Sequence, residues 1–150
     1  MFNIILFNPQ IPPNTGNIMR LCVNTNSNLF LIEPLGFNLD QKNLRRANLD
    51  YKLVEKTKIF ENFKNCYKYI NKSNFYFVTK FGEIKYSDIN YREGDTFIFG
   101  SEISGLPKQL TNKYSFPRIS IPMYAKSRSI NLSNAVSICV YEGLRQNNFF

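Results

Sequence analysis

The residues of this 150-residue chain that could do chemistry gather in three short polar segments. These segments span residues 14–20, 100–105 and 121–136, and they are rich in Gly, Ser, Asn, Arg and Glu. Such side chains bind and orient a ligand through hydrogen bonds and charge, but they do not supply a good general base at neutral pH. We therefore expect one ligand-binding site that is assembled from three loops.

Several common kinds of site are excluded. The chain has no His, and its three cysteines lie far apart, so neither a Ser-His-Asp triad nor a zinc site is expected and no metal is predicted. No carboxylate pair with an obvious catalytic spacing appears. There is no GxxxxGK[ST] motif, and no GxGxxG follows the first apolar run, so the usual dinucleotide-binding or Rossmann methyltransferase site lacks its main signal.

The charge and the apolar pattern bear on partners and location. A net charge of +8 favours a polyanionic partner such as nucleic acid, or a membrane surface, and a Lys-rich proteome would explain it equally well. Cys22 and Cys139 lie in apolar helical patterns, as expected of core thiols in a reducing compartment. The apolar N-terminal run is too short for a secretion signal, and no run approaches the ~20 residues of a membrane span. These features predict a soluble cytoplasmic protein.

The three segments must be positioned by regular elements, which the apolar spacing predicts. Short apolar runs predict strands at residues 2–7, 29–33, 75–79, 96–99 and 118–121. Helical spacing predicts helices from residue 14 or 15 to 20–25, over 60–70, 106–113 and 133–146, and a short one after Asp40. Pro9, Pro12 and Pro13 predict an extended loop, after which Asn14 or Thr15 would cap the first helix. Ser133 would cap or open the last helix.

Strands that alternate with helices predict a single α/β domain over residues 1–150, with a mostly parallel sheet and helices on both faces. In such sheets ligands bind beyond the carboxyl ends of the strands. The segments at 100–105 and 121–136 each follow a predicted strand. We therefore expect the site at this edge of the sheet.

The three segments, in this order, resemble the signature motifs of the SPOUT methyltransferases, in the branch that methylates ribose 2′-hydroxyls of RNA. They read Asn14-Thr15-Gly16-Asn17-Ile18-Met19-Arg20, then Phe99-Gly100-Ser101-Glu102-Ile103-Ser104-Gly105-Leu106-Pro107, then Ile121-Pro122-Met123 followed by Ser127-Arg128-Ser129-Ile130-Asn131-Leu132-Ser133-Asn134-Ala135-Val136. Pro12-Pro13 before the first motif and Leu44-Arg45-Arg46-Ala47 also resemble the YibK/TrmL group of tRNA (cytidine/uridine-2′-O)-methyltransferases. The resemblance covers essentially the whole chain.

The resemblance implies a fold, a reaction and partners. The fold would be an α/β sheet whose C-terminal part forms a trefoil knot. The reaction would transfer the methyl group of S-adenosylmethionine to the ribose of the wobble nucleotide of tRNA, in leucine tRNAs by the family pattern. The protein would be a homodimer that packs through its first and last helices. An rRNA target, or a non-catalytic basic RNA-binding protein on the same fold, are the alternatives.

The resemblance also implies roles for individual residues. The implied catalytic residues are Arg20, Asn14, Glu102, Ser129 and Asn131. The implied cofactor-binding residues are Val78, Thr79, Gly100, Ser101, Gly105, Ile121, Met123, Ser129 and Asn131. The implied RNA-binding residues are Arg20, Arg45, Arg46, Arg128 and Tyr141. Because a guanidinium stays protonated, Arg20 is expected to stabilise a developing alkoxide or grip a phosphate. Glu102 is expected to anchor Arg20 or a backbone amide of a motif.

Overall fold

The computed structural model describes residues 1–39, 56–70, 72–124 and 127–149, and these residues form one parallel sheet with helices on both faces. Its strands are β1 (Asn3–Phe7), β2 (Asn28–Ile32), β3 (Thr57–Phe60), β4 (Phe75–Val78), β5 (Ile84–Lys85), β6 (Thr96–Phe99) and β7 (Arg118–Ser120). Their order is β3-β2-β1-β6-β4-β7-β5, and each neighbouring pair is parallel. The predicted α/β class is confirmed.

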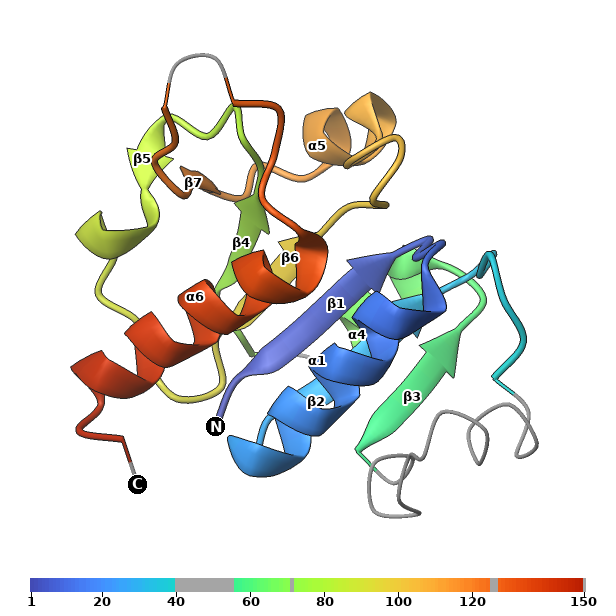
Figure 1. Cartoon of the computed structure of the whole chain (residues 1–150), viewed down its shortest axis with the longest axis horizontal. Coiled ribbons are helices and arrows are strands. Elements are labelled where there is room, and N and C mark those ends of the chain that lie inside the picture. Colours follow the sequence, from blue (N-terminus) through green and yellow to red (C-terminus); the bar gives the residue numbers. More distant parts are fainter. Residues whose placement is uncertain (40–55, 71, 125–126, 150) are drawn as a thin grey trace.

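Helices cover both faces of this sheet. Helices α1 (Pro12–Asn24) and α6 (Leu132–Gln146) lie side by side on one face, in front of the sheet in Figure 1. Their buried side chains pack with Ile4 and Leu6 of β1, whereas Ile5 packs on the other face with α4 (Phe63–Ile70) and α5 (Lys108–Lys113). This division follows from the period of two along a strand, which sends successive side chains to opposite faces. A short 3₁₀ helix, η1 (Tyr86–Asp88), follows β5.

The start of α1 differs from the prediction. The helix begins at Pro12, so Pro12 and Pro13 occupy its first turn and do not form an extended loop. The first helical N–H groups have no partner inside the helix and the fixed φ of proline suits this turn, so proline costs little there. The N-cap is Ile11, which makes no side-chain cap bond, and the predicted capping by Asn14 or Thr15 is wrong.

Other boundaries differ at the sheet edges and at the last helix. Phe60, predicted to be helical, ends the edge strand β3, and the two-residue edge strand β5 was not predicted. Both strands lack a buried apolar run, which was the signal used. Asn131, rather than Ser133, caps α6, because its side chain accepts a hydrogen bond from the Ser133 amide at 2.9 Å. The helix predicted after Asp40 falls outside the described residues.

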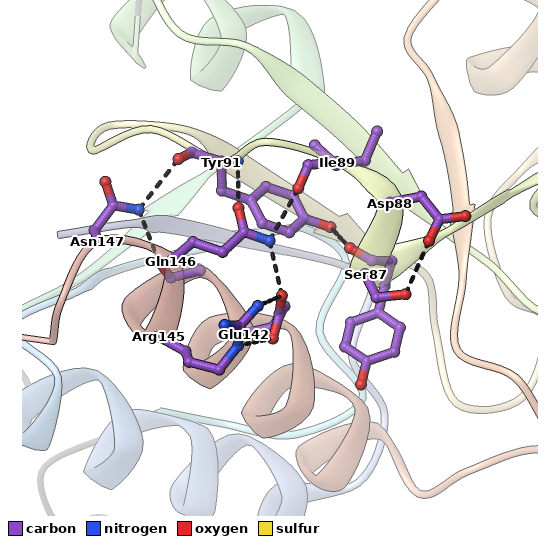
Figure 2. Close-up of polar contacts among 10 residues, drawn as sticks. Ser87, Asp88, Ile89, Tyr91, Glu142, Arg145, Gln146 and Asn147 are labelled. Atoms are coloured by element: carbon purple, nitrogen blue, oxygen red, sulfur yellow. Dashed lines mark hydrogen bonds and ion pairs between the residues drawn. The ribbon is translucent and has the colours of Figure 1, made fainter.

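A cluster of side-chain hydrogen bonds fixes the C-terminal end of α6 to the segment that precedes β6 (Figure 2). Gln146 Oε1 accepts the Tyr91 amide at 2.9 Å, and Gln146 Nε2 donates to the Ile89 carbonyl at 2.9 Å and to Glu142 Oε1 at 2.7 Å. Asn147 Nδ2 donates to the Tyr91 carbonyl at 3.1 Å. The polar side chains therefore hold the helix in place at the end away from the predicted site.

Substitution of Gln146 by alanine is expected to lower the free energy of unfolding by about 1–3 kcal/mol, because it leaves several half-buried backbone and side-chain groups without a partner. Urea denaturation followed by circular dichroism measures the change. Gln109→Ala, at an exposed position on α5, is the matched control and is expected to change stability little. Equal effects of the two substitutions would contradict the assigned contacts.

The three cysteines are core residues, as predicted for Cys22 and Cys139. Cys22, Cys66 and Cys139 are free and buried, and burial raises the pKa of each thiol to about 12. They therefore remain protonated at neutral pH and are poor nucleophiles. Among the helices of the described ranges, none combines the length and the apolar character that crossing a bilayer requires.

Candidate active site

A cavity of about 710 Å³ opens at the carboxyl edge of the sheet, where β4, β6 and β7 end. Its walls come from the segments that follow these strands and from the N-termini of α1 and α6. The predicted cofactor-binding residues all line it, namely Val78, Thr79, Gly100, Ser101, Gly105, Ile121, Met123, Ser129 and Asn131. The structure thus brings the three sequence motifs together around one space.

Four of the five predicted catalytic residues also line this cavity: Asn14, Glu102, Ser129 and Asn131. Arg20 does not. It is exposed on α1, six residues after Asn14, which places it about 240° around the helix from Asn14. The geometry of one protomer therefore separates Arg20 from the other four residues.

The loop after β6 is a tight turn that depends on its two glycines. The Gly105 amide donates to the Ser101 carbonyl at 2.8 Å, and Gly105 has a φ of +68°, a conformation that other residues rarely adopt. A Cβ atom on Gly100 would lie 2.1 Å from the carbonyl carbon of Gly105. The two ends of the loop therefore approach so closely that only glycine fits at position 100, and the turn forms one wall of the cavity.

A directed chain of hydrogen bonds joins the three motifs across the cavity wall. Asn131 Oδ1 accepts from the Ser133 amide at 2.9 Å and from Ser133 Oγ at 2.7 Å. Asn131 Nδ2 then donates to Asn14 Oδ1 at 3.0 Å, and Asn14 Nδ2 donates to Glu102 Oε1 at 3.0 Å. Each amide oxygen faces a donor and each amide nitrogen faces an acceptor. The chain therefore sets the orientation of both asparagine side chains.

The carboxylate of Glu102 ends this chain and also holds the backbone before α1. Glu102 Oε2 accepts the Gln10 amide at 2.8 Å, and Oε1 accepts the Ile11 amide at 3.2 Å. Burial alone would raise the pKa of Glu102, but the hydrogen bonds from Gln10, Asn14 and Ile11 outweigh it and lower the pKa below its usual value. Glu102 is therefore charged at neutral pH and lies at the positive end of α1.

These contacts bear on the two roles expected for Glu102. It anchors backbone amides, but these are the amides of Gln10 and Ile11, which precede the first motif, and not amides of a motif. The other expectation, an anchor for Arg20, is not met within one protomer, because its described residues include no ion pair between Glu102 and Arg20. Three donors already surround the carboxylate, so it has little capacity left for a guanidinium.

The predicted RNA-binding residues lie outside the cavity or outside the described residues. Arg128 and Tyr141 are exposed and do not line the cavity; Tyr141, on α6, is 48% exposed. Arg45 and Arg46 fall in residues 40–55, beyond the described ranges. The structure therefore places Arg20, Arg128 and Tyr141 on the surface, where a large partner can reach them.

Sequence reasoning missed several residues of the site. Ser133 was taken for a cap and not for a partner of Asn131, and the Gln10 and Ile11 amides carried no signal because any residue has such a group. Phe81 also lines the cavity, as does Ile103, which lies in the segment 100–105 expected to form the site but was given no role of its own. Their positions just beyond β4 and β6 were a usable signal, since ligands bind beyond strand ends.

The sequence matches known proteins over nearly its full length. Residues 1–141 match the model of the SpoU rRNA Methylase family. The chain is 42% identical over 150 residues to a tRNA (cytidine(34)-2'-O)-methyltransferase of Methylovorus glucosotrophus, a match that covers 99% of this chain and 97% of the relative.

Solved structures share the fold. One of them is described as giving structural insights into the 2-OH methylation of C/U34 on tRNA. It superposes with a TM-score of 0.90 at 34% identity, and the match covers 99% of this chain and 97% of that chain. The SpoU methyltransferase AviRb of Streptomyces viridochromogenes, in complex with the cofactor AdoMet, has a TM-score of 0.84 at 19% identity, covering 97% of this chain and 60% of that chain. At that identity the likeness concerns the fold alone.

Proposed function

The chain belongs to the SpoU rRNA methylase family, and on that premise we propose that it transfers a methyl group from S-adenosylmethionine to the ribose 2′-hydroxyl of the wobble nucleotide, cytidine or uridine 34, of tRNA. The observation that carries the proposal is the cavity at which all three motifs meet. A tRNA target is favoured over rRNA because the similarity to the tRNA-modifying relative extends over nearly the full length of both chains.

The cavity suits S-adenosylmethionine in size and in chemistry. About 710 Å³ accommodates a nucleoside with an amino-acid tail, and the walls combine apolar side chains such as Val78 and Ile121 with polar groups such as Thr79 and Ser129. When bound, the cofactor supplies an activated methyl group on its sulfonium. The protein then has mainly to hold the ribose hydroxyl in line with that group.

Asn14 and Asn131 are the residues best placed to orient the ribose. Each amide nitrogen carries two N–H groups, and the directed chain of hydrogen bonds uses one of them. The other can donate to a ribose oxygen at the cavity wall, and because the chain fixes both amides, this donor is preorganised. Glu102, with its lowered pKa and three donors, is a weak base, so we assign it a positioning role rather than proton removal.

A homodimer is part of the proposal, because Arg20 does not line the cavity of its own protomer. Helices α1 and α6 pack together, and the exposed Arg20 and Tyr141 lie on them. A second copy packed against these helices would bring its Arg20 toward the cavity. There the guanidinium stabilises the negative charge that develops on the ribose oxygen.

The proposal also includes structural details, substrate tRNAs and RNA contacts that family membership suggests. These are the trefoil knot near the C-terminus, a single domain over residues 1–150, leucine tRNAs as substrates and RNA contacts by Arg45, Arg46 and Arg128. A cytoplasmic location also belongs here, since three free buried thiols are typical of a reducing compartment.

Methyl transfer from labelled S-adenosylmethionine to unmodified tRNA, with the product nucleosides mapped, tests the function. We expect label on the 2′-oxygen of nucleotide 34. If rRNA and not tRNA is labelled, the substrate is rRNA and the proposed tRNA target is wrong. If the protein neither binds the cofactor nor transfers label, it is a non-catalytic basic RNA-binding protein on this fold.

Substitution of Gly100 by alanine is expected to raise the Kd for S-adenosylmethionine at least about tenfold, because the new Cβ would collide with the Gly105 backbone and displace the cavity wall. Isothermal titration calorimetry measures the Kd. Gly94→Ala controls for backbone strain, since Gly94 has a φ of +88° but has open space around it and lies away from the cavity. An unchanged Kd in Gly100→Ala would contradict the placement of the cofactor.

A further inference from the structure

Phe81 is an apolar side chain at the mouth of the cavity with no assigned role. The residue is 77% exposed, yet it lines the cavity from the turn that follows β4. We propose that Phe81 is a stacking platform for a base of the substrate RNA, at or next to the nucleotide that is methylated. The inference rests on the proposed function and adds a substrate-binding residue to it.

The turn that carries Phe81 is held firmly against β7. The Thr79 amide donates to the Ile119 carbonyl at 3.0 Å, the Phe81 amide donates to Thr79 Oγ1 at 3.3 Å, and the Gly82 amide donates to the Thr79 carbonyl at 3.1 Å. A Cβ atom on Gly82 would lie 2.3 Å from the carbonyl carbon of Ile119. The backbone thus approaches β7 as closely as glycine allows. A ring on such a turn is presented at a fixed place, which lowers the entropic cost of binding.

The positive charge beside the ring is complementary to the negative charge of a nucleic acid. Lys80 Nζ lies over the Phe81 ring, 5.0 Å from its centroid, and Lys80 is an exposed residue. A cation on one face of the ring leaves the other face for a planar ligand, and the same cation can contact a phosphate. An aromatic ring next to a positive charge is the combination with which proteins hold single-stranded nucleic acid. The net charge of +8 favours the same partner.

A second apolar side chain meets the same cavity from another loop. Ile103, 81% exposed, lies on the loop after β6 and also lines the cavity. Phe81 and Ile103 thus provide apolar surface at the mouth, while the polar chain of Asn14 and Asn131 lies in the wall. A nucleotide has the matching distribution, with apolar base faces and a polar ribose.

Three substitutions at position 81 test the proposal. Phe81→Ala and Phe81→Leu are each expected to raise KM for tRNA about tenfold, since both remove the flat aromatic face, and Phe81→Trp is expected to keep it within about twofold. The Kd for S-adenosylmethionine and the oligomer mass are expected not to change. Ile59→Ala is the control, because Ile59 is 47% exposed but lies on β3 at the opposite edge of the sheet.

Other results would overturn the proposal. An unchanged KM in Phe81→Ala would remove the stacking role, and a normal KM in the leucine variant would mean that any apolar group suffices. A weaker Kd for S-adenosylmethionine would assign the ring to the cofactor, and loss of the dimer would assign it to an interface between protomers. If the wild-type protein transfers no methyl group to tRNA, the proposed function fails first, and filter binding of tRNA to the same variants still tests the platform.

Discussion

The Glu102→Gln variant is expected to lose about 100-fold in kcat for methyl transfer and about 1–3 kcal/mol in the free energy of unfolding. The two oxygens of Glu102 accept hydrogen bonds from the Gln10 and Ile11 amides and from Asn14 Nδ2. A glutamine side chain has only one acceptor oxygen, so its NH₂ group would face at least one of these donors and could not accept from it. Asn14 or the backbone before α1 would then shift, and the ribose would no longer be held in line with the methyl group.

Single-turnover kinetics with saturating cofactor and tRNA measure the first effect, and urea denaturation measures the second. Glu93→Gln is the control, because Glu93 lies away from the cavity and its exposed carboxylate pairs with the N-terminal amine. Normal turnover in Glu102→Gln would show that the hydrogen-bond chain does not position the reacting group.

The same carboxylate predicts a pH dependence of stability. The pKa of Glu102 is lowered in the folded protein, so its contribution is complete above the unfolded pKa of about 4.3 and is lost as the pH falls through the folded pKa. The difference in free energy of unfolding between the wild type and Glu102→Gln is therefore expected to stay constant above the unfolded pKa and to narrow as the pH falls below about 4.3. A difference that also stays constant below this pH would contradict the assigned hydrogen bonds.

The Arg20→Ala variant is expected to lose about 10²–10³ in kcat while it binds S-adenosylmethionine normally, since Arg20 lies outside the cavity and would act on the developing charge of the ribose oxygen. Arg20→Lys restores little of the rate, because an ammonium lacks the planar set of donors. Arg92→Ala is the matched control. Arg92 is exposed and precedes β6, so it lies at the amino ends of the strands, whereas the cavity lies at their carboxyl ends. Normal turnover in Arg20→Ala would remove Arg20 from the reaction.

A mixed dimer tests whether Arg20 serves the cavity of the partner. Purified heterodimers that pair an Arg20→Ala protomer with an Asn131→Ala protomer carry one intact site of two if Arg20 acts across the interface, and about half of the wild-type activity is expected. If Arg20 serves its own protomer, each site carries one substitution and the heterodimer is inactive. Both homodimeric variants are expected to be inactive in either case, so the readout is unambiguous.

The fold class and the location of the site were predictable from the sequence. The strands at the centre of the sheet, β1, β2, β4 and β6, appear as short apolar runs, because a strand that is buried on both faces needs apolar side chains at every position. Parallel strands bring their carboxyl ends to one edge, so motifs that follow β6 and β7 must meet there. The gathering of the motif residues around one cavity follows from these local signals.

Local signals were weaker at the edges and at helix ends. The edge strands β3 and β5 were missed because their exposed side chains leave no apolar run. Asn14 was expected to cap α1 because asparagine is a good cap, yet two prolines begin the helix and leave Asn14 inside its first turn. The pattern of residue types did not show where its side chain would point.

The tertiary structure alone decided which groups meet. Glu102 contacts the Gln10 and Ile11 amides, more than 90 residues away in sequence, rather than Arg20, which shares the motif of Asn14. The exposure of Phe81 likewise depends on how its turn packs against β7. Residue types report which interactions a side chain can make, but the choice among partners is made by distance and direction in space, and these exist only once the chain has folded.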